Sequence, residues 1–279
     1  MALTLAQIES RVDVAHRHPA WAFVRRHPLL VIGGVLLALM ALVALAAPWI
    51  APFNPTDMSV LKRLKAPNAI HHFGTDAMGR DVLSRVLWGG RVSMIVGLSV
   101  ALLATGLGML IGMVAGFSRA ADALIMRVMD GMMAIPGILL AVALMALMRA
   151  SIETVVIAIT VPEIPRVVRL VRSLVLVIRE QPYVQAAVAI GTRFHWILLR
   201  HVLPNAVTPL IVQGTFISAS AVLFEAYLSF LGAGTPPEIP SWGNMMAEGR
   251  AVAQLAFNII LFPGIFLGLT VLSINLLGD

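Results

Sequence analysis

Residues 185–204, which read QAAVAIGTRFHWILLRHVLP, lie between two long apolar runs of the chain. The stretch is too short and too mixed in polarity to cross a bilayer, because a transmembrane helix takes about 20 predominantly apolar residues. A structured amphipathic segment between two membrane spans is expected to face water and to meet a soluble partner. Six residues mark this segment, namely a glutamine with two alanines, a glycine and a Leu-Pro pair: Gln185, Ala186, Ala187, Gly191, Leu203 and Pro204.

The spacing within this stretch predicts two short helices joined by a turn. An apolar and mostly small stripe recurs with helical periodicity: Val184, Ala187, Val188 and Gly191. Gly191 is suited to end the first helix, because glycine adopts positive φ without steric cost. A second short helix follows from about Phe194. Pro204 fits the first turn of the next apolar run, where its missing N–H is not needed.

The composition predicts a protein that crosses a membrane several times. The chain has 279 residues, of which 59% are hydrophobic and only 12% charged, whereas a soluble domain carries about 25% charged residues. The net charge of +6 does not indicate nucleic-acid binding, because the basic residues lie at the ends of apolar runs, as in membrane proteins. The lack of cysteine excludes disulfides, thiolate catalysis and Cys-zinc sites.

We expect an all-α polytopic membrane protein with six transmembrane helices. The first run is longer than a signal-peptide core and is therefore interpreted as a retained span. The fourth run is interrupted by Pro162, Glu163 and Pro165, which are expected to break or kink it. The six predicted spans are Pro28–Ala47, Val92–Phe117, Leu124–Met148, Ile152–Val177, Ala206–Leu231 and Leu255–Leu277.

The predicted organisation has three parts. Residues 1–27 form a cytoplasmic N-terminal segment, 28–91 the first span with an outer segment, and 92–279 a five-helix core with a cytoplasmic loop at about 179–204. Flanking basic residues place both termini in the cytoplasm. The outer segment conflicts with this orientation because six cations lie in it: Lys62, Arg63, Lys65, Arg80, Arg85 and Arg91.

Several residues inside these segments carry separate expectations. Thr75 or Asp76 is expected to cap a helix that runs to about Trp88. Glu225, within the fifth span, is either a substrate or gating contact or a helix-packing hydrogen bond. Asp130 is expected to pair with Arg127. Arg166, Arg169 and Arg172 are interpreted as headgroup anchors. His71 and His72 have no further ligand at metal-binding spacing.

The residues of the 185–204 stretch resemble the cytoplasmic loop of permease subunits of bacterial ABC importers. Ala186, Ala187 and Gly191 match the loop pattern of that family in register, as does the Leu-Pro pair. Gln185 stands where the family has glutamate, and His201 where isoleucine is usual. Three further segments are similar to the dipeptide/oligopeptide/nickel permease group, in the order of its "C" subunit: Phe73–Arg85, Glu225–Gly232 and Pro240–Gly243.

This resemblance implies a type I ABC importer permease (MetI-like) fold and transport of short peptides by alternating access. The resemblance implies that this chain lies in the bacterial cytoplasmic membrane. The implied partners are a second homologous permease, two ABC ATPases and an external substrate-binding protein. ATP and Mg would be bound by the ATPases, and no cofactor by this chain. The ATPases would dock on Gln185–Leu203, the binding protein on Asp76, Arg80 and Asp81. Gly108, Gly112 and Gly116 suit ordinary helix packing or a seam with the second permease.

Other functions stay open at this stage. Glu163, Glu225 and the interrupted fourth span also suit an ion- or proton-coupled secondary transporter that works alone. Nickel chelates or glutathione are alternative cargoes. An enzyme is disfavoured, since the chain lacks the phosphate-binding loop of nucleotide hydrolases and the common hydrolase motifs.

Overall fold

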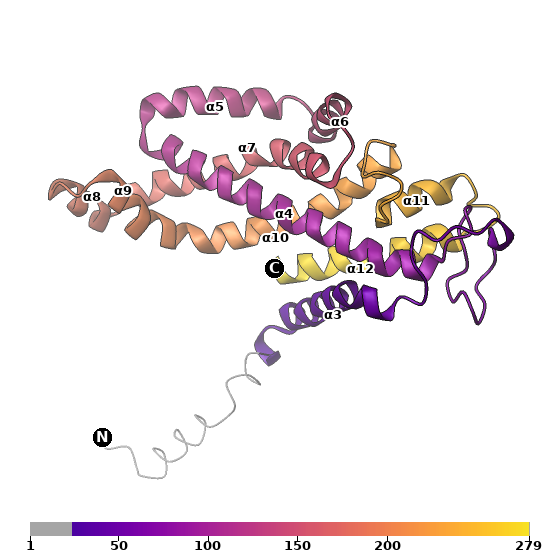
Figure 1. The fold of residues 1–279 in the computed structure, drawn as a ribbon. Coiled ribbons are helices and arrows are strands. Elements are labelled where there is room, and N and C mark those ends of the chain that lie inside the picture. Colours follow the sequence, from indigo (N-terminus) through magenta and orange to yellow (C-terminus); the bar gives the residue numbers. More distant parts are fainter. Residues whose placement is uncertain (1–23, 279) are drawn as a thin grey trace, which may run out of the picture.

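The computed structural model describes residues 24–278, so most of the predicted N-terminal segment 1–27 lies outside the described residues. The described part is helical, and its only β-type pairing is an isolated bridge between Thr75 and Asp81. Figure 1 shows an elongated bundle, with α8 and α9 at one end and the segment 51–81 beside α11 at the other. The helices are α3 (Pro28–Ile50), α4 (Val82–Phe117), α5 (Arg119–Met133), α6 (Gly137–Leu147), α7 (Ile152–Arg179), α8 (Pro182–Ala189), α9 (Phe194–Ile197), α10 (Leu203–Phe230), α11 (Trp242–Arg250) and α12 (Asn258–Gly278).

Four helical stretches of the described chain are long and apolar enough to cross a membrane. They are α3, α4, the stretch from His195 through α10, and α12. These stretches correspond to the first, second, fifth and sixth predicted spans. The protein is therefore an all-helical membrane protein with several spans. The predicted count of six is only partly reproduced, because the third and fourth predicted spans differ from the expected form.

The third predicted span is two helices rather than one. Only together are α5 and α6 long and apolar enough to cross a membrane, and they meet at an angle of 89°. The break lies at Ile135 and Pro136, directly before Gly137. Proline lacks the N–H of a helical hydrogen bond and disfavours helix at the residue before it. The chain therefore turns a full corner at Pro136.

The fourth predicted span is a single unbroken helix, so the expected interruption was wrong. α7 continues through Pro162 and Pro165 for 28 residues. α7 is not among the helices that are apolar enough to cross a membrane, because it carries too many charged side chains. Its charged residues are Glu153, Glu163, Arg166, Arg169, Arg172 and Arg179. α7 packs along α4 over much of its length, and this contact buries its valine face.

The arginines of α7 pair with acids, and their expected role as headgroup anchors stays a prediction. Arg169 Nη2 lies 2.8 Å from Asp130 Oδ1 on α5, so the expected pairing of Asp130 with Arg127 was wrong. Arg172 pairs with Asp122, also on α5, and Arg166 pairs with Glu163 of α7 itself at 3.0 Å. α5 and α7 run side by side (Figure 1), and the pairs of Arg169 and Arg172 join them.

The glycines of α4 form a seam with α7 inside this chain. A Cβ atom at Gly108 would lie 2.5 Å from Val167 Cβ, and one at Gly116 would lie 2.6 Å from Val175 Cβ. A Cβ at Gly112 would lie 2.8 Å from Val171 Cβ. The absence of side chains lets the two backbones approach, as in other membrane helix pairs. The described structure therefore supports ordinary packing and uses this face for α7 instead of a second permease.

The second span begins ten residues earlier than expected. No separate helix forms from Thr75 or Asp76. Asp81 caps α4 by accepting a hydrogen bond from Ser84 N at 2.8 Å, and the helix runs unbroken into the membrane. At 1.5 Å per residue its 36 residues span about 54 Å, against about 30 Å for the hydrocarbon core. α4 is therefore much longer than the hydrocarbon core is thick.

Candidate functional site

The 185–204 stretch forms the helix-turn-helix that its sequence predicts. Pro182 begins α8, and Gly191, with φ of +80°, follows its end. Gly191 N donates to Val188 O at 2.9 Å, and Thr192 N donates to Ala187 O at 3.0 Å. This pair of bonds is the Schellman arrangement, which satisfies the last carbonyls of a helix and needs a left-handed residue. The predicted role of Gly191 as the helix stop is confirmed.

α8 presents different residues to the protein and to solvent. Val184 is fully buried and Ala187 is 9% exposed, so both face the chain itself. Gln185 and Ala186 are exposed on the other face. Only Ala186 of the two alanines is thus available to a partner, whereas the sequence pattern made both candidates. The buried valine anchors α8 on the main core.

The second half of the stretch, after the turn that follows α8, continues into the next membrane helix without a loop. α9 continues through a π-helical turn, Leu198–Val202, directly into α10, which begins at Leu203 with Pro204 in its first turn. The predicted place of Pro204 is confirmed. The π turn is not apparent in the sequence. The result is one helical stretch from His195 to Phe230, so a displacement of α9 reaches the membrane directly.

A small cavity of about 370 Å³ lies between α8 and the end of α4. Phe117, Val184 and Val188 form its apolar walls. Arg179 and Glu180 lie at its edge, with 3.1 Å between Arg179 Nε and Glu180 Oε1. Gln185 Nε2 donates to the carbonyl of Glu180 at 3.3 Å, so this side chain braces the turn between α7 and α8.

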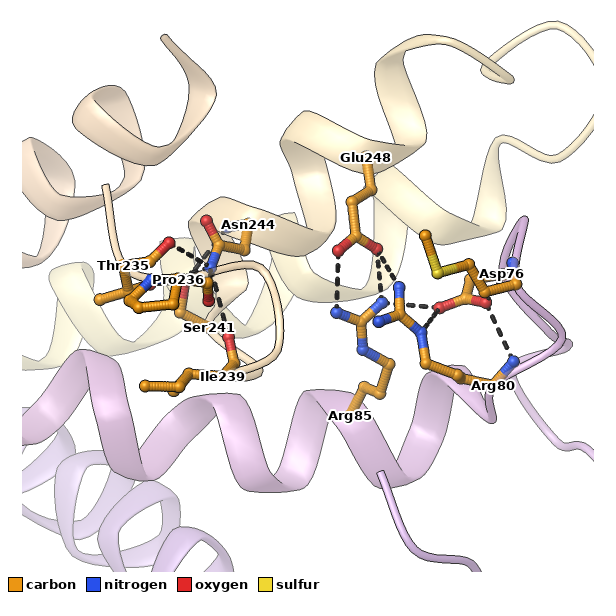
Figure 2. A network of polar contacts seen from close by, with 10 residues as sticks. Asp76, Arg80, Arg85, Thr235, Pro236, Ile239, Ser241, Asn244 and Glu248 are labelled. Atoms are coloured by element: carbon orange, nitrogen blue, oxygen red, sulfur yellow. Dashed lines mark hydrogen bonds and ion pairs between the residues drawn. The ribbon is translucent and has the colours of Figure 1, made fainter. Parts of the chain in front are cut away.

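The opposite end of the molecule holds a network of four charged side chains, of which Asp76, Arg80 and Arg85 are buried and Glu248 is partly exposed (Figure 2). Asp76 Oδ2 accepts from Arg80 Nε at 2.7 Å and from Arg85 Nη1 at 2.6 Å. Glu248 of α11 accepts from the same two arginines, at 2.5 Å from Arg80 Nη2 and 2.6 Å from Arg85 Nη1. Two cations and two carboxylates therefore neutralise one another and tie α11 to the start of α4.

The pKa of Asp76 reflects this network. Burial of the carboxyl raises the pKa, but Arg85, Arg80 and the backbone N–H of Arg80 favour the charged form and outweigh burial, so the pKa is lower than the usual 3.8.

The same segment holds a second buried pair, since His71 Nδ1 is 2.9 Å from Asp81 Oδ1.

Asp76, Arg80 and Asp81, the expected contacts for a binding protein, are between 1% and 4% exposed. Their side chains shape the outer segment rather than offer a free surface, and their role toward a partner stays a prediction. The sequence pattern missed Arg85, Glu248 and His71. Arg85 lies nine residues after Asp76, so an argument from local spacing could have found it. Glu248 lies 163 residues away from Arg85, so no such argument could have found Glu248.

The segment Pro240–Gly243 fastens α11 to α4 and α10. Ser241 caps α11 by accepting from Asn244 N at 3.1 Å. Trp242 Nε1 donates to Val86 O at 3.0 Å, and the indole lies against Gly90 of α4, where a Cβ would meet it at 3.1 Å. Asn244 Nδ2 lies 2.9 Å from Thr235 Oγ1 and holds the preceding loop (Figure 2).

Glu163 and Glu225 are both buried. Glu225 Oε1 accepts from Ser229 Oγ on its own helix at 2.9 Å, and Oε2 accepts from Ser93 Oγ of α4 at 3.2 Å. Ser241, which caps α11, also hydrogen-bonds to Glu225, so this carboxyl joins α10 to α4 and to the start of α11. Glu163 pairs with Arg166 on its own helix. A role of either residue in the transport pathway or in gating stays a prediction.

Two larger cavities lie elsewhere in the described structure. One, of about 830 Å³, is open between the outer end of α3, the first turns of α4 and the loop around Glu238. The other, of about 740 Å³, is an apolar groove between α3, α4, α10 and α12. Neither Glu163 nor Glu225 lines these two cavities or the one beside α8. Among the described residues, no three His, Asp or Glu side chains are grouped to hold a metal ion.

Comparisons with known proteins agree with this architecture. Residues 104–279 match the family described as "Binding-protein-dependent transport system inner membrane component", and residues 18–67 match the N-terminal TM domain of oligopeptide transport permease C. A probable peptide ABC transporter permease of Sinorhizobium fredii is 48% identical, over 100% of this chain and 95% of its own.

Two other relatives cover nearly as much. A dipeptide transport permease of Alkalihalophilus pseudofirmus is 37% identical, over 93% of this chain and 86% of its own. A glutathione transport permease of Pectobacterium atrosepticum is 36% identical, over 92% and 86%. The resemblance first seen in the loop and outer segments is thereby confirmed, and the chain belongs to the family of inner membrane components of binding-protein-dependent transport systems.

Proposed function

We propose that this chain is one membrane subunit of an ATP-driven importer of short peptides. The observation that carries the proposal is α8, a capped helix with an exposed face, which lies between α7 and the helical stretch that continues as the span α10. When a soluble partner displaces such a helix, the displacement is transmitted to the span that follows it. The relatives are named as peptide, dipeptide and glutathione permeases, which supports short peptides as cargo.

The partners follow from this function. Two ATPases would bind ATP and Mg and dock on α8 of this chain and of a second, homologous permease. An external binding protein would deliver the peptide at the end that carries α11. The start of α3 and the end of α12 both point toward the end of the molecule that carries α8 (Figure 1), which supports placing both termini in the cytoplasm.

Reconstitution tests the proposal directly. The chain, purified with the permease, ATPases and binding protein encoded beside it, is expected to take up labelled dipeptides into vesicles only when ATP is supplied. A chain that never retains an ATPase when its partners are co-expressed would contradict the proposal. Uptake by the isolated chain without ATP would instead establish a secondary transporter.

Replacing Ala186 with tryptophan is expected to uncouple the transporter without unfolding it. Ala186 is exposed on the free face of α8, so a large side chain there meets the ATPase and not this chain. We expect a loss of at least about tenfold in peptide uptake and in ATP hydrolysis, which corresponds to about 1.4 kcal/mol of docking free energy. The amount of protein in the membrane should be unchanged.

The matched control is Ala150→Trp, at an exposed alanine between α6 and α7. It should leave uptake within about twofold of the unmodified protein, since it adds the same bulk away from α8. Ala187→Trp is unsuitable, because that side chain is buried and the change would disturb the loop itself. Normal uptake by Ala186→Trp would argue against ATPase docking on this face.

A further inference from the structure

The outer segment places six cations where basic residues are uncommon, and the structure accounts for three of them. Arg80 and Arg85 are buried and neutralised by Asp76 and Glu248. Arg91 lies over the ring of Trp88, 5.1 Å from its centroid. These three cations are therefore used within the fold.

The other three cations stand together on the surface. Lys62, Arg63 and Lys65 are exposed, and no acidic side chain in the described chain pairs with them. Lys62 contacts only the ring of Phe53, at 5.8 Å. Residues 58–65, which we name the basic turn, also present apolar side chains to solvent. Val60 is 73% exposed and Leu61 is 91% exposed, among the highest values for large apolar residues of the described chain.

The basic turn is held rigidly in this form. Leu64 N donates to Asp76 O at 3.1 Å, and Lys65 N donates to Thr75 Oγ1 at 2.9 Å. Leu64 has φ of +53°, in the left-handed region that a residue with a large side chain seldom adopts. Gly79 lies so close to Ser59 O that a Cβ there would meet it at 1.9 Å. A costly backbone conformation that the surrounding contacts enforce is a common mark of a functional surface.

The basic turn belongs to the segment 51–81, which lies at the end of the molecule opposite α8 (Figure 1). It is bonded to Asp76 and Thr75, a few residues before the start of α4. α4 is about 24 Å longer than the hydrocarbon core is thick, and its first turns carry the buried ion network. A charged network of this kind places those turns, and the basic turn with them, outside the hydrocarbon.

We propose that the basic turn is the docking surface for the external binding protein, and that the docking face of that protein is acidic around an apolar patch. This inference rests on the proposed function. The family is defined by its dependence on a binding protein, so a partner at this end is required. With Asp57 as the only acid beside three cations, residues 57–65 carry a net charge of +2. Leu61 would insert into the apolar patch, as buried anchors do at the centre of interfaces.

Anionic lipid headgroups are the competing occupant, and the observations favour the protein. Val60 and Leu61 belong to the segment before α4, and the buried charged network that holds this segment argues against its immersion in lipid. A rigid backbone also suits a shaped protein face more than a fluid headgroup layer. Exposed charges that face opposite charges on a partner mainly raise the rate of association, and added salt weakens this attraction.

The experiment uses the complete transporter in nanodiscs, with its own binding protein added in increasing concentration. The variant Lys62→Glu/Arg63→Glu/Lys65→Glu is expected to raise, by about tenfold or more at low salt, the binding-protein concentration that half-stimulates ATP hydrolysis. The maximal rate should stay unchanged. Leu61→Ser should raise the same concentration several-fold. The matched control Lys62→Arg/Arg63→Lys/Lys65→Arg keeps the charge and should stay within about twofold.

Three outcomes would overturn the assignment of the basic turn. The first is a charge-reversed variant that responds to the binding protein as the unmodified chain does. The second is a lower maximal rate at saturating binding protein, which would make the turn structural. An effect seen only in discs that contain phosphatidylglycerol would identify lipid as the occupant. If the unmodified transporter itself is never stimulated by its binding protein, the proposed function fails, and not the assignment alone.

Discussion

Replacing Asp76 with asparagine is expected to destabilise the outer half of the protein by about 3–5 kcal/mol, the range for breaking a buried ion pair. Asp76 is 1% exposed and receives hydrogen bonds from Arg80 and Arg85. Its loss leaves two buried guanidinium groups facing Glu248 alone. The expected readout is a lower melting temperature of the purified protein in detergent, followed by tryptophan fluorescence, because Trp242 is packed beside this region.

The matched control is Asp57→Asn, which removes an exposed acid of the same segment and should change stability by less than about 0.5 kcal/mol. Adding Arg80→Gln to Asp76→Asn should recover part of the loss, since it removes the one uncompensated positive charge and leaves Arg85 paired with Glu248. A melting temperature equal to that of the Asp57 control would show that the network contributes nothing to stability.

The same carboxyl sets an acid limit. Because the pKa of Asp76 is lower when folded, its contribution is fully present above the unfolded value of 3.8 and is lost as the pH falls through the folded pKa. Stability between pH 5 and 8 should therefore not depend on Asp76 titration. In a melt series below pH 4, the difference between the unmodified protein and Asp76→Asn should shrink.

Replacing Gly112 with alanine is expected to cost about 1–3 kcal/mol by overpacking the contact between α4 and α7. The new methyl would lie 2.8 Å from Val168 O and 2.8 Å from Val171 Cβ. The first of these atoms belongs to the backbone, so the contact is relieved only if the helices separate. We expect a lower melting temperature and less protein recovered as a single species after heating in detergent.

Gly106 offers the matched control on the same helix, because a Cβ there meets nothing within 4 Å. Gly106→Ala should be neutral or slightly stabilising, since alanine favours helix more than glycine does. Combining Gly108→Ala with Gly112→Ala should lower stability further, as both face α7. Equal melting temperatures for the Gly106 and Gly112 variants would contradict the seam.

The structure of the 185–204 stretch was largely predictable, since its features are local. The stop at Gly191 and the place of Pro204 in the first turn of α10 depend on backbone conformations that particular residue types favour. The spacing of apolar and small residues also predicted helix for α8. Local spacing did not decide which alanine faces outward. Ala187 is buried because α8 lies on Val184 and the core beneath it, and that orientation depends on α7.

The partners of the charged residues were not predictable. Asp130 has Arg127 nearby in sequence, but pairs with Arg169, which lies 39 residues later on the neighbouring helix. The cap of α4 was also misplaced, because Thr75, Asp76 and Asp81 are all suitable capping residues. The bridge between Thr75 and Asp81 and the arginines around Asp76 occupy the first two and leave Asp81 to cap.

By itself the sequence determined that this is an all-helical membrane protein with a water-facing helix-turn-helix at 185–204, because apolar length, periodicity and glycine or proline preferences act within a few residues. Only the tertiary structure decided that the glycines of α4 meet α7, that α5 and α6 turn a corner, and that Arg85 reaches Glu248. These outcomes depend on which helices lie side by side, and packing over distances of many residues sets that choice.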